Sequence, residues 1–169
     1  MEKKIKVAFI YKPSNPFFNK EHFDKTTYYF SMHALKRSKD LEVTYFPAEK
    51  SFDATKLKGK YDVIMLSNHD SATPDEIIGI KQLDIPVIAR CGDFHNAKKY
   101  DTIKFHEKYK IDYYYNFMSE KYFYKFYPKD FKYKTIVLGL EPSFYQNNNP
   151  FKDRIKDRIL VTGALGKKI

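Results

Sequence analysis

Short apolar runs separated by polar segments recur along the whole chain. Continuous apolar runs are typical of central strands in a parallel sheet, because such strands bury both faces. Other runs alternate or are rich in β-branched and aromatic residues, which also indicates strands. Six strands are predicted on these grounds, at residues 5–11, 41–46, 61–67, 85–90, 111–117 and 135–140.

The segments between these strands suit helices. The strongest local signal is at Thr73, where Thr73 can cap a helix, Pro74 suits its first position, and Glu76 can reach back to the cap. Elsewhere apolar residues recur at spacings of three and four. The expected helices are residues 26–37, 73–83, 97–109 and 119–127.

The alternation of strand and helix predicts an α/β fold. It implies a Rossmann-like, doubly wound parallel sheet with helices on both faces, in three layers. A polar stretch that ends at Pro150 is typical of a linker. We expect a Rossmann-like domain at residues 1–145, a linker at 146–157, and the first strand and glycine loop of a truncated second domain at 158–169.

The loop after the first strand is a candidate ligand contact. It contains Lys12, which precedes Pro13, and Asn15, which precedes Pro16. The loop is therefore stiff, unlike the glycine-rich phosphate loop of a dinucleotide-binding fold. In doubly wound sheets this carboxyl edge is where ligands bind, so Lys12 and Asn15 are candidate substrate-binding residues.

Polar clusters follow the third and fourth strands. Asn68, His69 and Asp70 follow the third strand, and Asp93 and His95 follow the fourth. Each cluster pairs a carboxylate with an imidazole, the usual material of a general base and its orienting partner. Helix capping is the simpler interpretation of either cluster. A zinc or iron site on the same side chains is a third, although no compact ligand motif is present.

Net charge, cysteine content and the absence of targeting signals limit the possible partners, the disulfide bonding and the localisation of the chain. The chain has 31 basic and 21 acidic residues and a formal net charge of +10, which favours anionic partners, although genome composition is an equal explanation. A single cysteine, Cys91, excludes an internal disulfide, and a lone cysteine at a strand end is more typical of a small buried residue than of a nucleophile. No signal peptide or membrane-spanning run is recognisable, so we expect a cytoplasmic protein, with peripheral membrane attachment left open.

Residues 96–134 are rich in lysine and aromatic residues. They include 14 aromatics and 10 lysines against 5 acidic residues. Such a mixture suits single-stranded nucleic acid, a membrane interface or sugar rings. We favour a simpler interpretation, an amphipathic helix that buries Tyr122 and Phe126 and leaves Lys121 and Lys125 in solvent.

The C-terminal third carries a family resemblance. Residues 135–145, with Gly139, Leu140 and Glu141 at the strand end, resemble the strand that leads out of the N-terminal domain of GT-B glycosyltransferases. Residues 151–166 are similar to the crossing into the C-terminal domain of such enzymes. Residues 112–116 and the following Ser119 resemble the strand just before that one in such enzymes, where a second cleft-lining loop is placed.

The resemblance implies that the two domains bind different substrates. The N-terminal domain would bind a glycan or lipid-linked acceptor, and the C-terminal domain a nucleotide-sugar donor, with no metal or other cofactor for the transfer. Family-4-like retaining members often carry a histidine before an aspartate after the fourth strand, but Gly92 precedes Asp93 here. We therefore expect Asp93 to be the base, with His95 and His69 near it. The remaining candidates are substrate contacts at Lys12, Asn15, Asn68, Asp70, Asn116 and Glu141, and donor-loop glycines at Gly163 and Gly166.

The expected function is thus the acceptor-binding part of a sugar transferase, inactive without its donor-binding domain. The alternative is a non-catalytic module that binds nucleic acid or an anionic surface through the lysine- and tyrosine-rich segment. A flavodoxin-like or receiver-like regulatory domain is a third interpretation. Against a receiver, the first strand ends in Tyr11 and Lys12, without the paired acids that magnesium needs.

Overall fold

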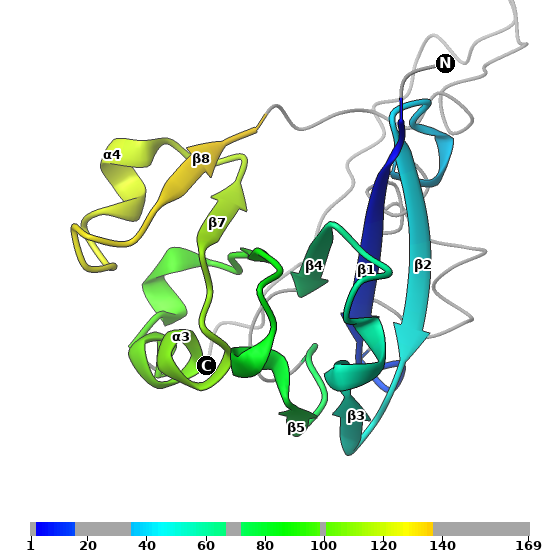
Figure 1. Cartoon of the computed structure of the whole chain (residues 1–169). Coiled ribbons are helices and arrows are strands. Elements are labelled where there is room, and N and C mark those ends of the chain that lie inside the picture. The colour runs from blue at the N-terminus through cyan, green and yellow to red at the C-terminus, as the bar shows by residue number, and fades with distance from the viewer. Residues whose placement is uncertain (1–2, 16–34, 67–71, 99–100, 137–169) are drawn as a thin grey trace, which may run out of the picture.

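The computed structural model describes residues 3–15, 35–66, 72–98 and 101–136 of the chain. Six strands form one parallel sheet in the order β2–β1–β4–β6–β7–β8 (Figure 1). The strands are β1 Ile5–Tyr11, β2 Leu41–Pro47, β4 Val63–Leu66, β6 Val87–Arg90, β7 Tyr113–Asn116 and β8 Tyr133–Thr135. The prediction of an α/β fold with a parallel sheet is confirmed.

The first five predicted strands are all present. The sixth begins two residues earlier than predicted, because Tyr133 pairs with Tyr114 of β7 and buries its ring. Of the predicted strand, residues 137–140 lie outside the described part, as do the predicted linker and the start of a second domain.

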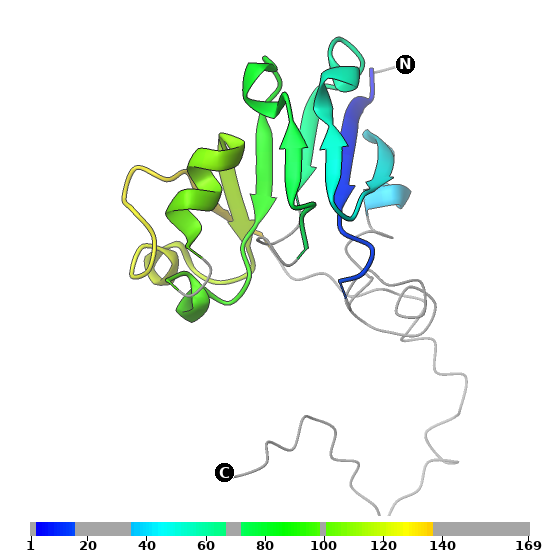
Figure 2. The ribbon, with the colours of Figure 1, turned by 90° about the horizontal axis from the view of Figure 1, so that it is seen from below.

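The order of the strands reverses at β1. This strand lies between β2 and β4, and the later strands add successively beyond β4 (Figure 2). The carboxyl ends of β1 and β4 therefore flank the topological switch point, where open α/β sheets usually bind ligands.

The helix predicted from Thr73 does not form. Within this segment, β5 (Glu76–Ile78) pairs in parallel with β3 (Ser51–Asp53), and a 3-10 turn, η3 (Ile80–Gln82), follows. The amide of Glu76 donates to the carbonyl of Lys50 at 2.9 Å instead of entering a helical ladder. The pairing of β5 with β3 thus provides the backbone hydrogen bonds of a segment for which the capping signal predicted a helix.

Thr73 and Pro74 are buried rather than at a solvent-exposed helix start. The carbonyl of Pro74 accepts a hydrogen bond from the hydroxyl of Tyr109 at 3.0 Å. This contact ties the segment before β5 to helix α3 (Thr102–Tyr109).

Helices are short in the described part. The α3 helix begins after Asp101, whose carboxylate accepts from the Lys104 amide, and it covers only the second half of the predicted helix at 97–109. The α4 helix has a single turn, Glu120–Phe123. The other short elements are η2 (Ala54–Leu57) and η4 (Phe94–Asn96). The helix predicted at 26–37 lies mostly outside the described residues.

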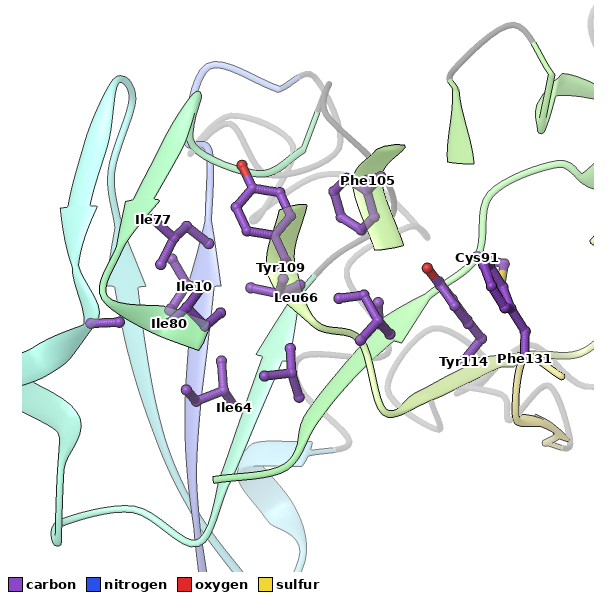
Figure 3. Packing of buried hydrophobic residues seen from close by; sticks show 14 of the residues in the cluster. Ile10, Ile64, Leu66, Ile77, Ile80, Cys91, Phe105, Tyr109, Tyr114 and Phe131 are labelled. Carbon is purple, nitrogen blue, oxygen red and sulfur yellow. The ribbon is translucent and has the colours of Figure 1, made fainter. Parts of the chain in front are cut away.

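Both faces of the central strands bury apolar side chains. Ile10 and Leu66 belong to the larger cluster, which Phe105 and Tyr109 of α3 join (Figure 3). The opposite face carries a smaller cluster of Val7, Phe9, Met65 and Ala72. Burial on both faces explains why β1 and β4 are continuous apolar runs in the sequence.

A stack of aromatic rings closes the core around β8. Phe123 lies face to face with Tyr127 and with Tyr133, at centroid distances of 4.2 and 4.1 Å. Phe94 meets all three rings edge-on, at 5.5 to 5.8 Å. Much of the aromatic content of residues 96–134 is therefore core.

The predicted buried face of α4 was wrong. Phe123 and Tyr127 point into the core, whereas Tyr122 and Phe126 are 36% and 41% exposed. Tyr122 and Phe126 are four residues apart, and so are Phe123 and Tyr127. Spacing alone therefore did not show which of the two pairs is buried. The stack with Tyr133 selects the pair that is buried.

Candidate functional site

Asp93 and His95 lie on the turn after β6, one on each side of Phe94. The Phe94 side chain is completely buried, while Asp93 and His95 are exposed. Asp93 begins η4, but its carboxylate does not cap the turn. The buried ring thus fixes the turn from inside and leaves a carboxylate and an imidazole at the carboxyl edge of the sheet.

Asn116, at the end of β7, is hydrogen-bonded through its side chain to the start of the same loop. Its side-chain amide donates to the carbonyl of Cys91 at 2.6 Å and to that of Gly92 at 3.2 Å. Its side-chain oxygen accepts from the amide of Phe117 at 2.6 Å. Asn116 is 3% exposed, and these bonds engage both ends of its amide, so its role here is to position the loop.

Cys91 has no features of a nucleophile. Its side chain is 3% exposed, and burial raises the pKa of the thiol above its ordinary value. A reactive cysteine needs a lowered pKa and access to solvent. The prediction that this cysteine is a small buried residue is therefore confirmed.

Exposed aromatic rings border the Asp93 turn. The ring of Tyr122 lies 5.7 Å from that of Phe94, so the start of α4 lies directly against η4. Phe117, which follows β7, is 44% exposed, and Phe126 lies 5.2 Å from Tyr122. Tyr122 and Phe126 were predicted to lie in the core, so their exposure as a surface was not foreseen.

Lys12 connects the loops that follow β1 and β4. Its amide donates to the carbonyl of Ala72 at 2.9 Å, and its ammonium pairs with Asp75 at 2.5 Å. The Lys12 bond holds the pKa of the Asp75 carboxyl below its usual value, with smaller contributions from Lys108 and Lys50. The positive charge of Lys12 is thus balanced within the protein.

The rest of the loop after β1 is also fixed. Ser14 donates from its amide and its hydroxyl to the two carboxylate oxygens of Glu49, at 2.7 and 2.6 Å. Asn15 is 5% exposed. These contacts hold the described part of the loop, residues 12–15, against the neighbouring segments.

The predicted candidates form two groups in the described part. Asp93, His95 and Asn116 gather at the ends of β6 and β7, while Lys12 and Asn15 lie at the end of β1. Because β4 separates β1 from β6, two strand spacings, about 10 Å, lie between the groups. The remaining candidates lie outside the described residues: Asn68, His69, Asp70, Glu141, Gly163 and Gly166.

In the described part of the chain, no group of three or more His, Cys, Asp or Glu side chains could hold a metal ion. No described helix is long and apolar enough to cross a bilayer.

These features define the class: a parallel α/β protein whose exposed acid and imidazole lie at the carboxyl edge of the sheet. Comparisons of the chain with protein-family models, curated proteins and solved structures find no match.

Proposed function

We propose that this chain is the acceptor-side domain of a GT-B glycosyltransferase, which transfers a sugar from a nucleotide-sugar donor to a glycan or lipid-linked acceptor. The observation that carries the proposal is the Asp93 turn. It carries an exposed carboxylate and an exposed imidazole two residues apart, and it is held by Phe94 and Asn116. A rigid support of this kind is what a general base requires.

Asp93 is the proposed base. The step is a single displacement with inversion, unlike that of the retaining family-4-like enzymes: the acceptor hydroxyl transfers its proton to the Asp93 carboxylate while its oxygen forms a bond to the anomeric carbon of the donor. The bond from that carbon to the donor phosphate breaks, and the leaving nucleotide takes the electron pair. His95, two residues away, stabilises the acceptor by hydrogen bonding.

The finer architecture belongs to the same proposal. Helices on both faces would complete a three-layer Rossmann-like domain over residues 1–145, and residues 158–169 would begin the donor-binding domain, with Gly163 and Gly166 in its first loop. His69, Asn68, Asp70 and Glu141 complete the proposed site, together with Lys12 and Asn15. The transfer itself uses no metal.

The test is a transfer assay on the full-length protein with a panel of nucleotide sugars and mixed glycan and lipid-linked acceptors. Asp93→Ala and His95→Ala are compared with Asp84→Asn, an exposed aspartate that precedes β6 at the opposite edge of the sheet. We expect loss of transfer for Asp93→Ala, a smaller loss for His95→Ala, and wild-type rates for Asp84→Asn. Full activity in both site variants would overturn the assignment of the base.

The second candidate is a non-catalytic module for nucleic acid or anionic surfaces. Lysine–ring pairs favour it: Lys125 lies 5.6 Å from the Tyr122 centroid, and Lys132 lies 5.0 Å from that of Tyr113. Tight binding that weakens steeply with salt, in a protein without transfer activity, would support this candidate instead.

A further inference from the structure

Tyr122 and Phe126 form a pair of exposed rings on α4 and the turn after it. They are 36% and 41% exposed, and their centroids are 5.2 Å apart at an interplanar angle of 79°. The intervening Phe123 is completely buried. The stacking of Phe123 in the core fixes the backbone of this segment, so both exposed rings extend from fixed positions on the surface.

Lysines lie beside these rings. Lys121 and Lys125 each precede one ring in the sequence, both are exposed, and the Lys125 ammonium lies 5.6 Å from the Tyr122 centroid. The surface therefore offers apolar ring faces and positive charge within one short segment.

The ring pair also borders the Asp93 turn. Tyr122 contacts Phe94, and Phe94 separates Asp93 from His95 in the sequence. A ligand on Tyr122 is therefore near the turn that carries Asp93, whose carboxylate can accept hydrogen bonds from hydroxyl groups.

We infer that Tyr122 and Phe126 are the platform for an acidic sugar unit of the acceptor, whose carboxylate or phosphate pairs with Lys125; this inference rests on the proposed function. One sugar unit satisfies all three features. Its C–H face packs on one ring while the other ring, at 79° to the first, flanks its edge; its anionic group meets the lysines, and its hydroxyls donate to Asp93. A nucleic acid strand or an anionic lipid surface would bring many phosphates towards Asp93, whereas one acidic sugar unit brings a single anionic group together with several hydroxyl donors.

The test is a binding titration of the 169-residue chain, followed by NMR. The probes are an oligogalacturonate, a sugar phosphate, a neutral maltooligosaccharide, a single-stranded oligonucleotide and vesicles of anionic phospholipid. We expect the acidic sugars to bind at least 10-fold more tightly than the neutral one, and shifts centred on Tyr122 and Phe126. Failure of both acidic sugars to bind, or stronger binding of the oligonucleotide or the vesicles, would overturn the inference.

Variants assign the binding to this surface. Tyr122→Ala with Phe126→Ala should weaken binding of the acidic sugar at least 10-fold, and Lys125→Ala should remove the preference over the neutral sugar. Tyr113→Ala is the matched control, because Tyr113 is 47% exposed and paired with Lys132, but lies at the amino end of β7. An equal loss in the control would contradict the platform, and Tyr122→Phe should retain binding if a ring face is what matters.

The two proposals fail separately. Asp93→Asn tests transfer; because the amide oxygen of asparagine still accepts a hydrogen bond, its loss of binding should be smaller than the 10-fold loss of the ring variants. Binding without any transfer activity in the full-length protein would overturn the proposed function, because the platform would then serve a lectin-like module. Transfer that survives loss of both rings, with an unchanged KM for the acceptor, would overturn the platform alone.

Discussion

The ring of Phe123 on α4 lies parallel to that of Tyr133 on β8, with centroids 4.1 Å apart and an interplanar angle of 12°. This contact joins the last described strand to the segment that carries the exposed rings. It also fixes Phe94, which packs edge-on against both rings, under the Asp93 turn.

Phe123→Ala should destabilise the protein by about 3–5 kcal/mol, the usual cost of removing a buried phenyl ring. Urea unfolding followed by far-UV circular dichroism measures the change. Phe126→Ala is the control three residues away, and because Phe126 is 41% exposed it should change the free energy of unfolding by less than about 1 kcal/mol. Equal losses in the two variants would contradict the assignment of the buried face.

Asn116→Ala should cost about 2 kcal/mol of stability, because it leaves the buried carbonyl of Cys91 and the amide of Phe117 without their partner. Asn96→Ala, on the neighbouring turn, is the matched control, since the Asn96 side chain forms no hydrogen bond with another described residue. Chemical denaturation of both variants measures the change in the free energy of unfolding. A neutral Asn116→Ala would mean that this side chain does not support the loop.

Stability should fall as the pH drops below the ordinary histidine pKa of 6.5, because burial lowers the pKa of His106 in the folded protein. The unfolded chain then binds the proton more readily than the folded one, so acid favours unfolding. The contribution is complete above pH 6.5 and declines towards the folded pKa. Nearby Asp130, Glu107 and Asp112 oppose the shift but do not reverse it.

His106→Phe isolates this effect. The ring of His106 stacks on Phe131 at 3.8 Å, and phenylalanine preserves that contact without a titrating group. Between pH 7.5 and 5.5, thermal melting should show a smaller loss of stability in the variant than in the wild type. Parallel pH profiles would show that His106 titrates alike in the folded and unfolded states.

Gly79→Ala should destabilise the protein by more than about 1 kcal/mol. Gly79 has a φ of 76°, and an added Cβ would lie 2.5 Å from Cγ2 of Thr55. Gly59→Ala is the control for backbone strain alone, because Gly59 has a φ of 68° with no atom within 4 Å of the added Cβ. Thr55→Ser, combined with Gly79→Ala, should recover the difference in unfolding free energy between the two alanine variants, and no recovery would exclude the clash.

The sheet was predictable because its central strands bury both faces and therefore appear as unbroken apolar runs. Val7 to Ile10 illustrates this, since every side chain of that run is buried. The pairing of β3 with β5 was not predictable. It joins residues about 25 positions apart, and the local capping signal at Thr73 points to a helix that this pairing overrides.

The candidate site was predicted in part. Asp93 and His95 follow a buried strand, and the structure leaves both exposed at the expected edge. Their support by Phe94 and Asn116 could not be foreseen, because it depends on contacts between different strands. The exposed rings were missed because Tyr122 with Phe126 and Phe123 with Tyr127 have the same spacing, and only the tertiary packing distinguishes them.

The central claim is that Asp93 accepts a proton from the acceptor during sugar transfer. The most direct measurement is the kcat of the full-length Asp93→Asn variant, which keeps the size of the side chain and removes its basicity. We predict a fall in kcat of about 100-fold or more, with the acceptor KM and the melting temperature close to wild type. An unchanged kcat in a folded Asp93→Asn protein would contradict the claim.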